Sequence, residues 1–174
     1  WKQKASLPGL SRWGAFGFSV SNKGYVGGGY HNGGSISDFW EYDPVSNTWT
    51  QKSSIPVALR TGSCFVINGL AYLTGGITGS GFGLNANLYA YDPVANAWSM
   101  KAPFPGVPRY GTAGFAIGNK GYFGIGNGGS AQGPYYNDFW EYDPVTDSWL
   151  QKATFPGTSR YGVHGVSLNG KRYV

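Results

Sequence analysis

Short apolar runs and polar turns alternate along the whole chain. The runs 16–20 and 115–117 each end in a short turn rich in Asn, Gly, Ser or Lys, and the first return run leads to the glycine pair Gly28-Gly29. Apolar runs of this length, bounded by such turns, are typical of β-hairpins. The pattern therefore predicts antiparallel strands throughout, with no helix longer than one turn.

One aromatic segment occurs three times, at 38–49, 87–98 and 138–149. In each copy an aromatic strand leads into Asp-Pro, where proline supplies the fixed φ of a type I turn, and an Asn or Asp near the end of the turn tolerates the left-handed conformation. Tryptophans at positions 1, 49, 98 and 149 give spacings of 48, 49 and 51 residues. A period of this size predicts a repeat architecture.

Each repeat predicts four strands, here named a to d, with a and b before the glycine pair and c and d after it. Four antiparallel strands repeated at this period form a β-propeller blade. The chain is thus predicted to be a single all-β propeller segment with repeats at about 1–48, 49–97, 98–148 and 149–174. It supplies a d strand at residues 1–6, three complete blades, and strands a and b of a further blade.

A diglycine closing strand b, a tyrosine in strand c and a tryptophan starting strand d resemble the signature of kelch repeats. The form Asp-Phe-Trp-Glu-Tyr-Asp-Pro, followed by Trp, Phe-Pro-Gly and Arg, is similar to tandem kelch repeats of secreted or cell-surface bacterial proteins. This resemblance implies a six- or seven-bladed propeller, a secreted or surface location, and missing blades supplied by the parent chain or another copy. Ile125, in the third diglycine, and Ala90, at the position of Glu41 and Glu141, depart from the pattern.

Composition and charge limit the kinds of ligand and partner that the sequence indicates. The 174 residues carry a formal charge of +5, and only 12% of them are charged, with no run of Lys or Arg that would indicate nucleic-acid binding. No apolar segment reaches the ~18 residues that membrane insertion requires. The lone Cys64 lies in an apolar run and is expected to be a buried side chain, while His31 and His164 occupy different repeat positions. We therefore expect no metal, no cofactor, no nucleic-acid partner and no membrane insertion.

The repeats differ in length mainly between strands b and c. From the last glycine of the pair to the aromatic strand there are nine positions in the first repeat, eleven in the second and twelve in the third, while the second repeat is one residue shorter between Arg60 and Ile67. Insertions in repeat proteins collect on the face that is free to diverge, often the binding face. In a meander blade the b–c and d–a connections emerge at the same end.

That end is the predicted binding face. It carries an arginine eleven residues after each tryptophan, together with aromatic residues and a histidine from the same loops, a combination suited to sugars, carboxylates or peptides. The candidate site residues are Arg12, Trp13, Tyr30, His31, Arg60, Arg109, Tyr110, Tyr135, Tyr136, Arg160 and Tyr161. For the arginines, a recurrence at one offset in every repeat favours a salt bridge or loop clamp over contact with a ligand.

These observations favour a non-catalytic binding or adhesion module for a protein or glycan. The alternatives are part of a carbohydrate-active kelch enzyme and an intracellular kelch adaptor. A galactose oxidase-like enzyme would require copper held by tyrosine and histidine, with a tyrosine–cysteine crosslink. A sialic-acid epimerase-like enzyme would require acid and base residues at the channel mouth. The sequence contains no nucleophile motif, phosphate loop or zinc pattern.

Overall fold

The computed structural model describes residues 1–130, 132–168 and 171–173, and no helix occurs in that part of the chain. Its main elements are three four-stranded antiparallel sheets, each with the strand order a-b-c-d. The first sheet comprises β1 (Phe16–Val20), β2 (Lys23–Gly27), β5 (Phe39–Asp43) and β6 (Thr48–Lys52). The second comprises β8 (Ser63–Ile67), β9 (Leu70–Thr74), β12 (Leu88–Asp92) and β13 (Ala97–Lys101).

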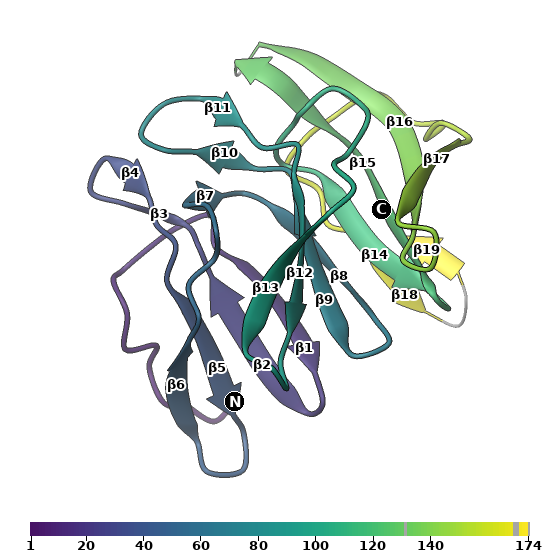
Figure 1. Ribbon diagram of the computed structural model, residues 1–174. Helices are drawn as coiled ribbons and strands as arrows, with labels where there is room; N and C mark the ends of the chain where they lie inside the picture. The colour runs from purple at the N-terminus through teal and green to yellow at the C-terminus, as the bar shows by residue number, and fades with distance from the viewer. Residues whose placement is uncertain (131, 169–170, 174) are drawn as a thin grey trace.

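The third sheet has longer inner strands. It comprises β14 (Ala113–Ile117), β15 (Lys120–Ser130), β16 (Gly133–Asp143) and β17 (Ser148–Lys152). A last pair, β18 (Val166–Leu168) and β19 (Lys171–Tyr173), supplies strands a and b of a further blade. The sheets follow one another in chain order, with their a strands as neighbours (Figure 1). The predicted all-β propeller segment with three complete blades is therefore confirmed.

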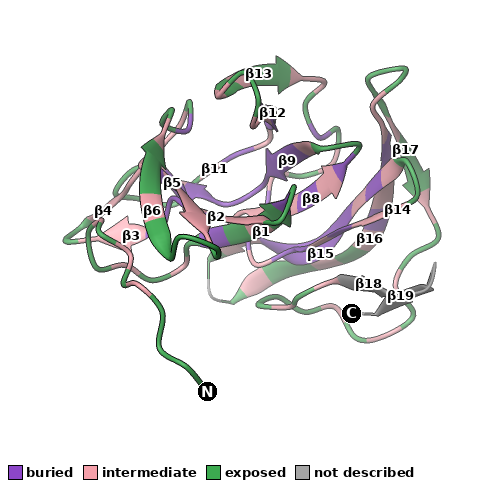
Figure 2. Cartoon of the chain, turned by 90° about the horizontal axis from the view of Figure 1, so that it is seen from below, coloured by how far each residue is buried: buried purple, intermediate pink, exposed green. Residues whose placement is uncertain are grey.

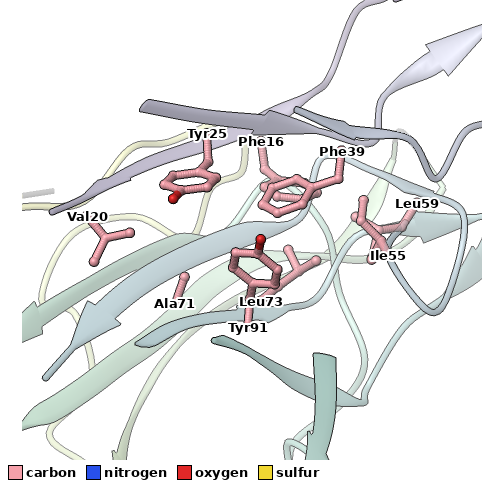
Figure 3. Packing of buried hydrophobic residues seen from close by; sticks show 9 residues of the cluster. All are labelled: Phe16, Val20, Tyr25, Phe39, Ile55, Leu59, Ala71, Leu73 and Tyr91. Carbon is pink, nitrogen blue, oxygen red and sulfur yellow. The ribbon is translucent and has the colours of Figure 1, made fainter. Parts of the chain in front are cut away.

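Apolar side chains fill the space between successive blades. Phe39 of the first blade meets Tyr91 of the second edge-on, with ring centroids 4.8 Å apart, and Phe16 and Leu73 belong to the same buried cluster (Figure 3). A second cluster joins Phe65 of the second blade to Tyr142 of the third. The second sheet is packed on both faces, between the first and the third, and its strands accordingly carry apolar or small residues at both parities.

The predicted turn between strands c and d recurs in every complete blade. Asp43, Asp92 and Asp143 each accept a hydrogen bond from the backbone N–H two residues later, at 2.8–2.9 Å. The left-handed residue is Asn47, Asn96 or Asp147, with φ of 57°, 51° and 48°. A local Asx turn thus starts each connection, and a left-handed residue ends it.

The tryptophans that open the d strands also hold the blades together. The indole N–H of Trp98 donates to the carbonyl of Ser53 at 3.0 Å, and that of Trp149 donates to the carbonyl of Ala102 at 3.0 Å. In both cases the linker leaving one blade is bonded to strand d of the next. The recurrence of a tryptophan at the start of strand d therefore reflects a hydrogen bond as well as packing.

The predicted d strand at residues 1–6 is wrong. The structure has no strand in residues 1–12, and the first residues are largely exposed (Figure 2). Within residues 1–6, Ala5 is anchored, because its N–H donates to Asn47 and its carbonyl accepts from Trp49, both at 2.9 Å. A strand needs a hydrogen-bonded neighbour, and no strand c lies beside this segment in the described part of the chain.

Candidate binding face

The b–c and d–a connections do meet at one end of the blades, as the meander topology predicts. The b–c connections form the small pairs β3 (Tyr30–His31) with β4 (Gly34–Ser35) and β10 (Ile77–Thr78) with β11 (Gly83–Leu84), and the ends of β15 and β16 extend in the same direction (Figure 1). Each d–a segment bridges to the b–c segment of its own blade: Trp13 pairs with Tyr30, and Tyr110 pairs with Asn127. We call this end of the molecule the loop face.

Two of the predicted arginines are buried clamps. Arg12 forms a two-pronged ion pair with Asp38, and Arg109 forms one with Asp138; the arginine side chains are 5% and 1% exposed. The Nε–H of Arg109 also donates to the carbonyl of Val107 at 2.8 Å. Both guanidinium groups are occupied by their own blade, so their geometry is that of a loop clamp rather than an open contact.

The pKa values of the two partner aspartates are lowered by this arrangement. Burial by itself raises the pKa of Asp138, but hydrogen bonds from Arg109 and from the indole of Trp140 outweigh it and hold the pKa below its ordinary value. The pKa of Asp38 is lowered in the same way by Arg12 and Trp40. The charged form of each aspartate is therefore the one that the fold stabilises.

The second blade has a different register, which corrects the sequence alignment. The carbonyl of Leu59 accepts a hydrogen bond from Gly29, just as the carbonyl of Arg109 accepts one from Gly76, at 2.8 and 2.9 Å. Arg60 pairs with Ile77 as Trp13 pairs with Tyr30. Leu59, not Arg60, therefore occupies the clamp position. The missing residue lies before Leu59, not between Arg60 and Ile67.

A chain of hydrogen bonds between blades gives the same alignment. Thr61 N–H donates to Gly14 O at 2.7 Å, Gly111 N–H donates to Thr61 O at 3.3 Å, and Gly162 N–H donates to Gly111 O at 2.9 Å. Thr61 has a left-handed φ of 55°, close to the φ values of 60–72° at the three glycines. A β-branched residue in this conformation is strained. Counting residues from the tryptophan places Gly62 at this position, but the hydrogen bonds place Thr61 there.

The clamp is replaced as a unit in the second blade. Leu59 is fully buried at the arginine position, and Asn87 stands where the other blades have Asp38 and Asp138. Asn87 donates to the hydroxyl of Tyr89 at 3.0 Å. An aspartate without its arginine would be a buried, uncompensated charge, so the loss of both charges together avoids that penalty.

Arg60 lies one residue after the clamp position and forms hydrogen bonds to two loops instead of to an aspartate. Its Nη1 donates to Ser35 Oγ at 2.9 Å and to Gly79 O at 3.1 Å, and its Nη2 donates to Gly81 O at 3.0 Å. Ser35 belongs to the b–c connection of the first blade, and the two glycines belong to that of the second. The guanidinium therefore lies across the seam between these two blades.

Aromatic rings surround Arg60. Its guanidinium carbon lies 4.6 Å from the ring centroid of Tyr30, 5.9 Å from that of Trp13 and 6.0 Å from that of Phe82. Trp13 is 58% exposed and Phe82 is 65% exposed. We call these four residues the seam patch. Sequence reasoning missed Phe82, although it is the one aromatic residue in the b–c connection of the second repeat.

Three tyrosines form a second group on the loop face. Tyr135 and Tyr161 stack nearly parallel, with centroids 5.5 Å apart, and both are partly exposed. Tyr110 meets Tyr161 edge-on but is buried, and its hydroxyl accepts a hydrogen bond from Asn127 at 3.1 Å. The structure therefore brings these predicted residues together but leaves Tyr110 as a support rather than an accessible contact.

The other candidates lie nearby with internal partners. Tyr136 receives the guanidinium of Arg109 at 4.3 Å from its ring, and His31 Nδ1 lies 2.7 Å from Ser11 O. Arg160 is exposed, and its Nε–H donates to Thr158 O at 2.9 Å. No carboxylate within residues 1–130, 132–168 and 171–173 forms an ion pair with Arg160.

A cavity of about 410 Å³ is lined by residues of the a strands and by the d–a residues directly before them. Its polar lining includes His164, Cys64 and the hydroxyls of Ser63 and Thr112, which lie 2.6 Å apart. Burial raises the pKa of the Cys64 thiol, so the nucleophilic thiolate is disfavoured. Nowhere in the described chain do three His, Cys, Asp or Glu side chains gather as a metal site would require.

Four-stranded blades packed face to face, with their variable loops on one end, define a β-propeller scaffold. The family model described as the KLHDC2/KLHL20/DRC7 Kelch-repeats domain matches residues 6–174. The chain belongs to this kelch-repeat family, whose propeller scaffold is commonly used for protein binding.

A solved structure of YjhT has the same fold. It superposes with a TM-score of 0.85 at 23% sequence identity, over 98% of this chain and 60% of that chain. This chain thus spans 60% of the length of that protein, and at this identity the likeness shows the fold alone. A search of curated proteins found no match. Within the described residues, no helix is long and apolar enough to span a bilayer.

Proposed function

We propose that this propeller segment is a binding module that recognises a protein partner through its loop face. The observation that carries the proposal is the pair of large exposed rings, Trp13 and Phe82, held over a buried guanidinium on that face. Exposed aromatic residues fixed by a rigid scaffold, together with arginine, are the side chains that dominate protein interfaces. The chain-length differences between repeats fall on the same face.

The clamps explain why these loops suit recognition. Arg12 and Arg109 fix the d–a segments of the first and third blades to the start of strand c, so Trp13, beside Arg12, projects from anchored backbone. Preorganised loops lose less conformational entropy on binding than free ones. The proposal therefore assigns the clamps a positioning role, and the exposed aromatic residues the contact role.

The residues that line the 410 Å³ cavity bear on the enzyme alternative. Among the described residues, its lining contains no Asp, Glu, Lys or Arg, and its one titratable imidazole, that of His164, stands without a carboxylate beside it in that lining. General acid and base catalysis of the epimerase type would require at least two such groups in reach of one substrate. Within the described residues, this lining holds fewer acid and base groups than the epimerase-type alternative requires.

A glycan ligand is a second candidate, favoured by the tyrosine pair. Tyr135 and Tyr161 are 36% and 45% exposed and stack 9° from parallel, and exposed aromatic rings are groups on which sugar rings pack. A secreted or cell-surface location, implied by the bacterial resemblance, would be consistent with either ligand and remains part of this proposal.

The test is affinity capture and a glycan array with single variants of the full protein. We expect Trp13→Ala, Phe82→Ala or Tyr161→Ala to weaken binding, and Asn22→Ala and Asn119→Ala, in the a–b turns at the opposite end, to leave it unchanged. Arg109→Ala should lower the melting temperature, with affinity preserved below it. Binding that survives all three loop-face variants but fails in the two turn variants would refute the proposal.

A further inference from the structure

Arg60 is a buried cation without an anion. The residue is 5% exposed, and no Asp or Glu in the described part of the chain forms an ion pair with it, in contrast to Arg12 and Arg109. Its three hydrogen bonds go to a hydroxyl and two backbone carbonyls, and its buried Nε–H has no partner. Buried charges in proteins are ordinarily paired, because desolvation without a counter-charge is costly.

The surroundings of Arg60 contain no alternative source of negative charge. The b–c connections 28–36 and 76–87 contain no Asp or Glu, and the segment 53–62 contains only Arg60 as a charged residue. Asp38, which precedes strand c of the first blade, is already bonded to Arg12 and Trp40. Aromatic faces attract a cation but do not neutralise it. The seam patch is therefore a cationic centre framed by two exposed apolar rings.

The loop over Arg60 is rich in glycine. Phe82 lies between Gly81 and Gly83, and the two carbonyls bonded to the guanidinium belong to Gly79 and Gly81. A Cβ added to Gly79 or Gly81 would meet no atom within 4 Å, so the space beside both glycines is open. Glycines also give such a segment wide conformational freedom. An incoming oxygen can therefore replace the carbonyl of Gly81 on Nη2.

We propose that the seam patch binds an acidic segment of a protein partner. The carboxylate of a Glu or Asp accepts hydrogen bonds from Arg60, and an apolar side chain beside it packs on Trp13 and Phe82. A charge-assisted bond replaces a neutral one, and the counter-charge that the fold lacks is supplied by the ligand. This inference rests on the proposed function and assigns the partner chemistry of one part of the loop face.

The experiment uses a peptide-display library panned against the full protein, followed by synthesis of the selected peptides and their Glu→Gln or Asp→Asn forms. We expect the selected peptides to contain an acidic residue next to an apolar one. Removing the acid should weaken binding about 10-fold, a typical loss for one charge-assisted hydrogen bond. Raising the salt concentration should weaken the acidic peptide more than its amide form.

The matched variants separate contact from support. Arg60→Gln should bind the acidic peptide and its amide form equally, a change in discrimination that a purely structural role would not produce. Trp13→Ala and Phe82→Ala should weaken both peptides several-fold, and Asn22→Ala, in an a–b turn at the opposite end, should leave both unchanged. If Arg60→Gln fails to fold, the salt dependence and the two aromatic variants decide the question.

Several outcomes would overturn the inference. It is wrong if the library yields no peptide, if the selected peptides lack an acidic residue, or if the amide form binds as well as the acid. Loss of binding in Tyr161→Ala but not in Trp13→Ala or Phe82→Ala would leave the proposed function standing and refute the seam patch. Loss only in Asn22→Ala and Asn119→Ala would refute both.

Discussion

The second blade lacks the charged side chains that form hydrogen bonds and ion pairs inside the first and third blades. Blades one and three carry an Arg–Asp clamp, and a strand-c glutamate that accepts a hydrogen bond from the tyrosine of strand b, at 2.6 Å to Tyr25 and 2.7 Å to Tyr122. The second blade has Leu59, Asn87 and Ala90 at these positions. A blade thus tolerates the removal of a whole polar network more easily than the removal of one partner.

The difference also shows how a scaffold position becomes available for recognition. With leucine in the clamp position, the arginine one residue further along the chain reaches Ser35 and Gly79 instead of an aspartate. The same residue type therefore serves two roles in neighbouring repeats, and the hydrogen-bond register decides which role it takes. The predictions below test this comparison in order of expected effect.

The largest effect should come from breaking a clamp on one side only. Arg109→Leu leaves Asp138 partly buried without its partner and should cost about 3–5 kcal/mol of unfolding free energy. The double variant Arg109→Leu/Asp138→Asn reproduces the arrangement of Leu59 and Asn87 and should recover most of that loss. Chemical denaturation measures both. A double variant no more stable than the single one would show that the second blade depends on other compensations.

A smaller effect is expected from the left-handed position between blades. Gly111→Ala would place a Cβ 2.8 Å from the backbone nitrogen of Gly162 at φ of 60°, and should cost about 1–3 kcal/mol. Thr61→Gly, at the equivalent position, should relieve strain and stabilise the protein or leave it unchanged. Thermal unfolding of the two variants tests the alignment directly: strong destabilisation by Thr61→Gly would contradict it.

The first and third blades should contribute to the pH dependence of unfolding free energy through their strand-c glutamates, which the second blade lacks. The hydrogen bond from Tyr122 lowers the pKa of Glu141, and the pKa of Glu41 is also lowered, because bonds from Tyr25 and nearby lysines outweigh its burial. Groups with a lowered pKa in the folded state stabilise it above their ordinary value of 4.5, and this contribution is lost as pH falls below it.

We therefore expect unfolding free energy to fall below about pH 4.5 and to fall less steeply in Glu41→Gln/Glu141→Gln, measured by denaturation from pH 7 to 3. The aspartates Asp38 and Asp138 contribute in the same direction at lower pH, so some dependence should remain. The Ala90 blade has no such carboxylate. If unfolding free energy falls with pH as steeply in the double variant as in the original protein, the two glutamates do not contribute to the pH dependence of stability.

The smallest stability effect should come from the contact residues. Phe82→Ala and Trp13→Ala remove rings that are more than half exposed, so each should change the unfolding free energy by less than about 1 kcal/mol. The same variants are expected to weaken partner binding, which separates recognition from folding. A loss of several kcal/mol in thermal unfolding would instead make the seam patch a packing cluster.

The sequence alone determined the all-β class, the four strands of each complete blade, the Asp-Pro turns and the end of the blades where the loops meet. These features depend on short-range physics, namely strand alternation, the φ preferences of proline, asparagine and glycine, and a regular period of aromatic residues. Even Ile125, the departure from the third diglycine, keeps the left-handed backbone of the glycines it replaces, with φ of 58°.

The tertiary structure alone decided the register of the second blade, the burial of Tyr110, the role of Phe82 and the absence of a strand at residues 1–6. A one-residue deletion can be placed at several points of a loop with equal local plausibility, and only the hydrogen bonds between blades select one. Whether an arginine is a clamp or part of a binding patch depends on which acceptors the neighbouring loops bring within reach. That depends on contacts between residues far apart in the chain, which no local pattern encodes.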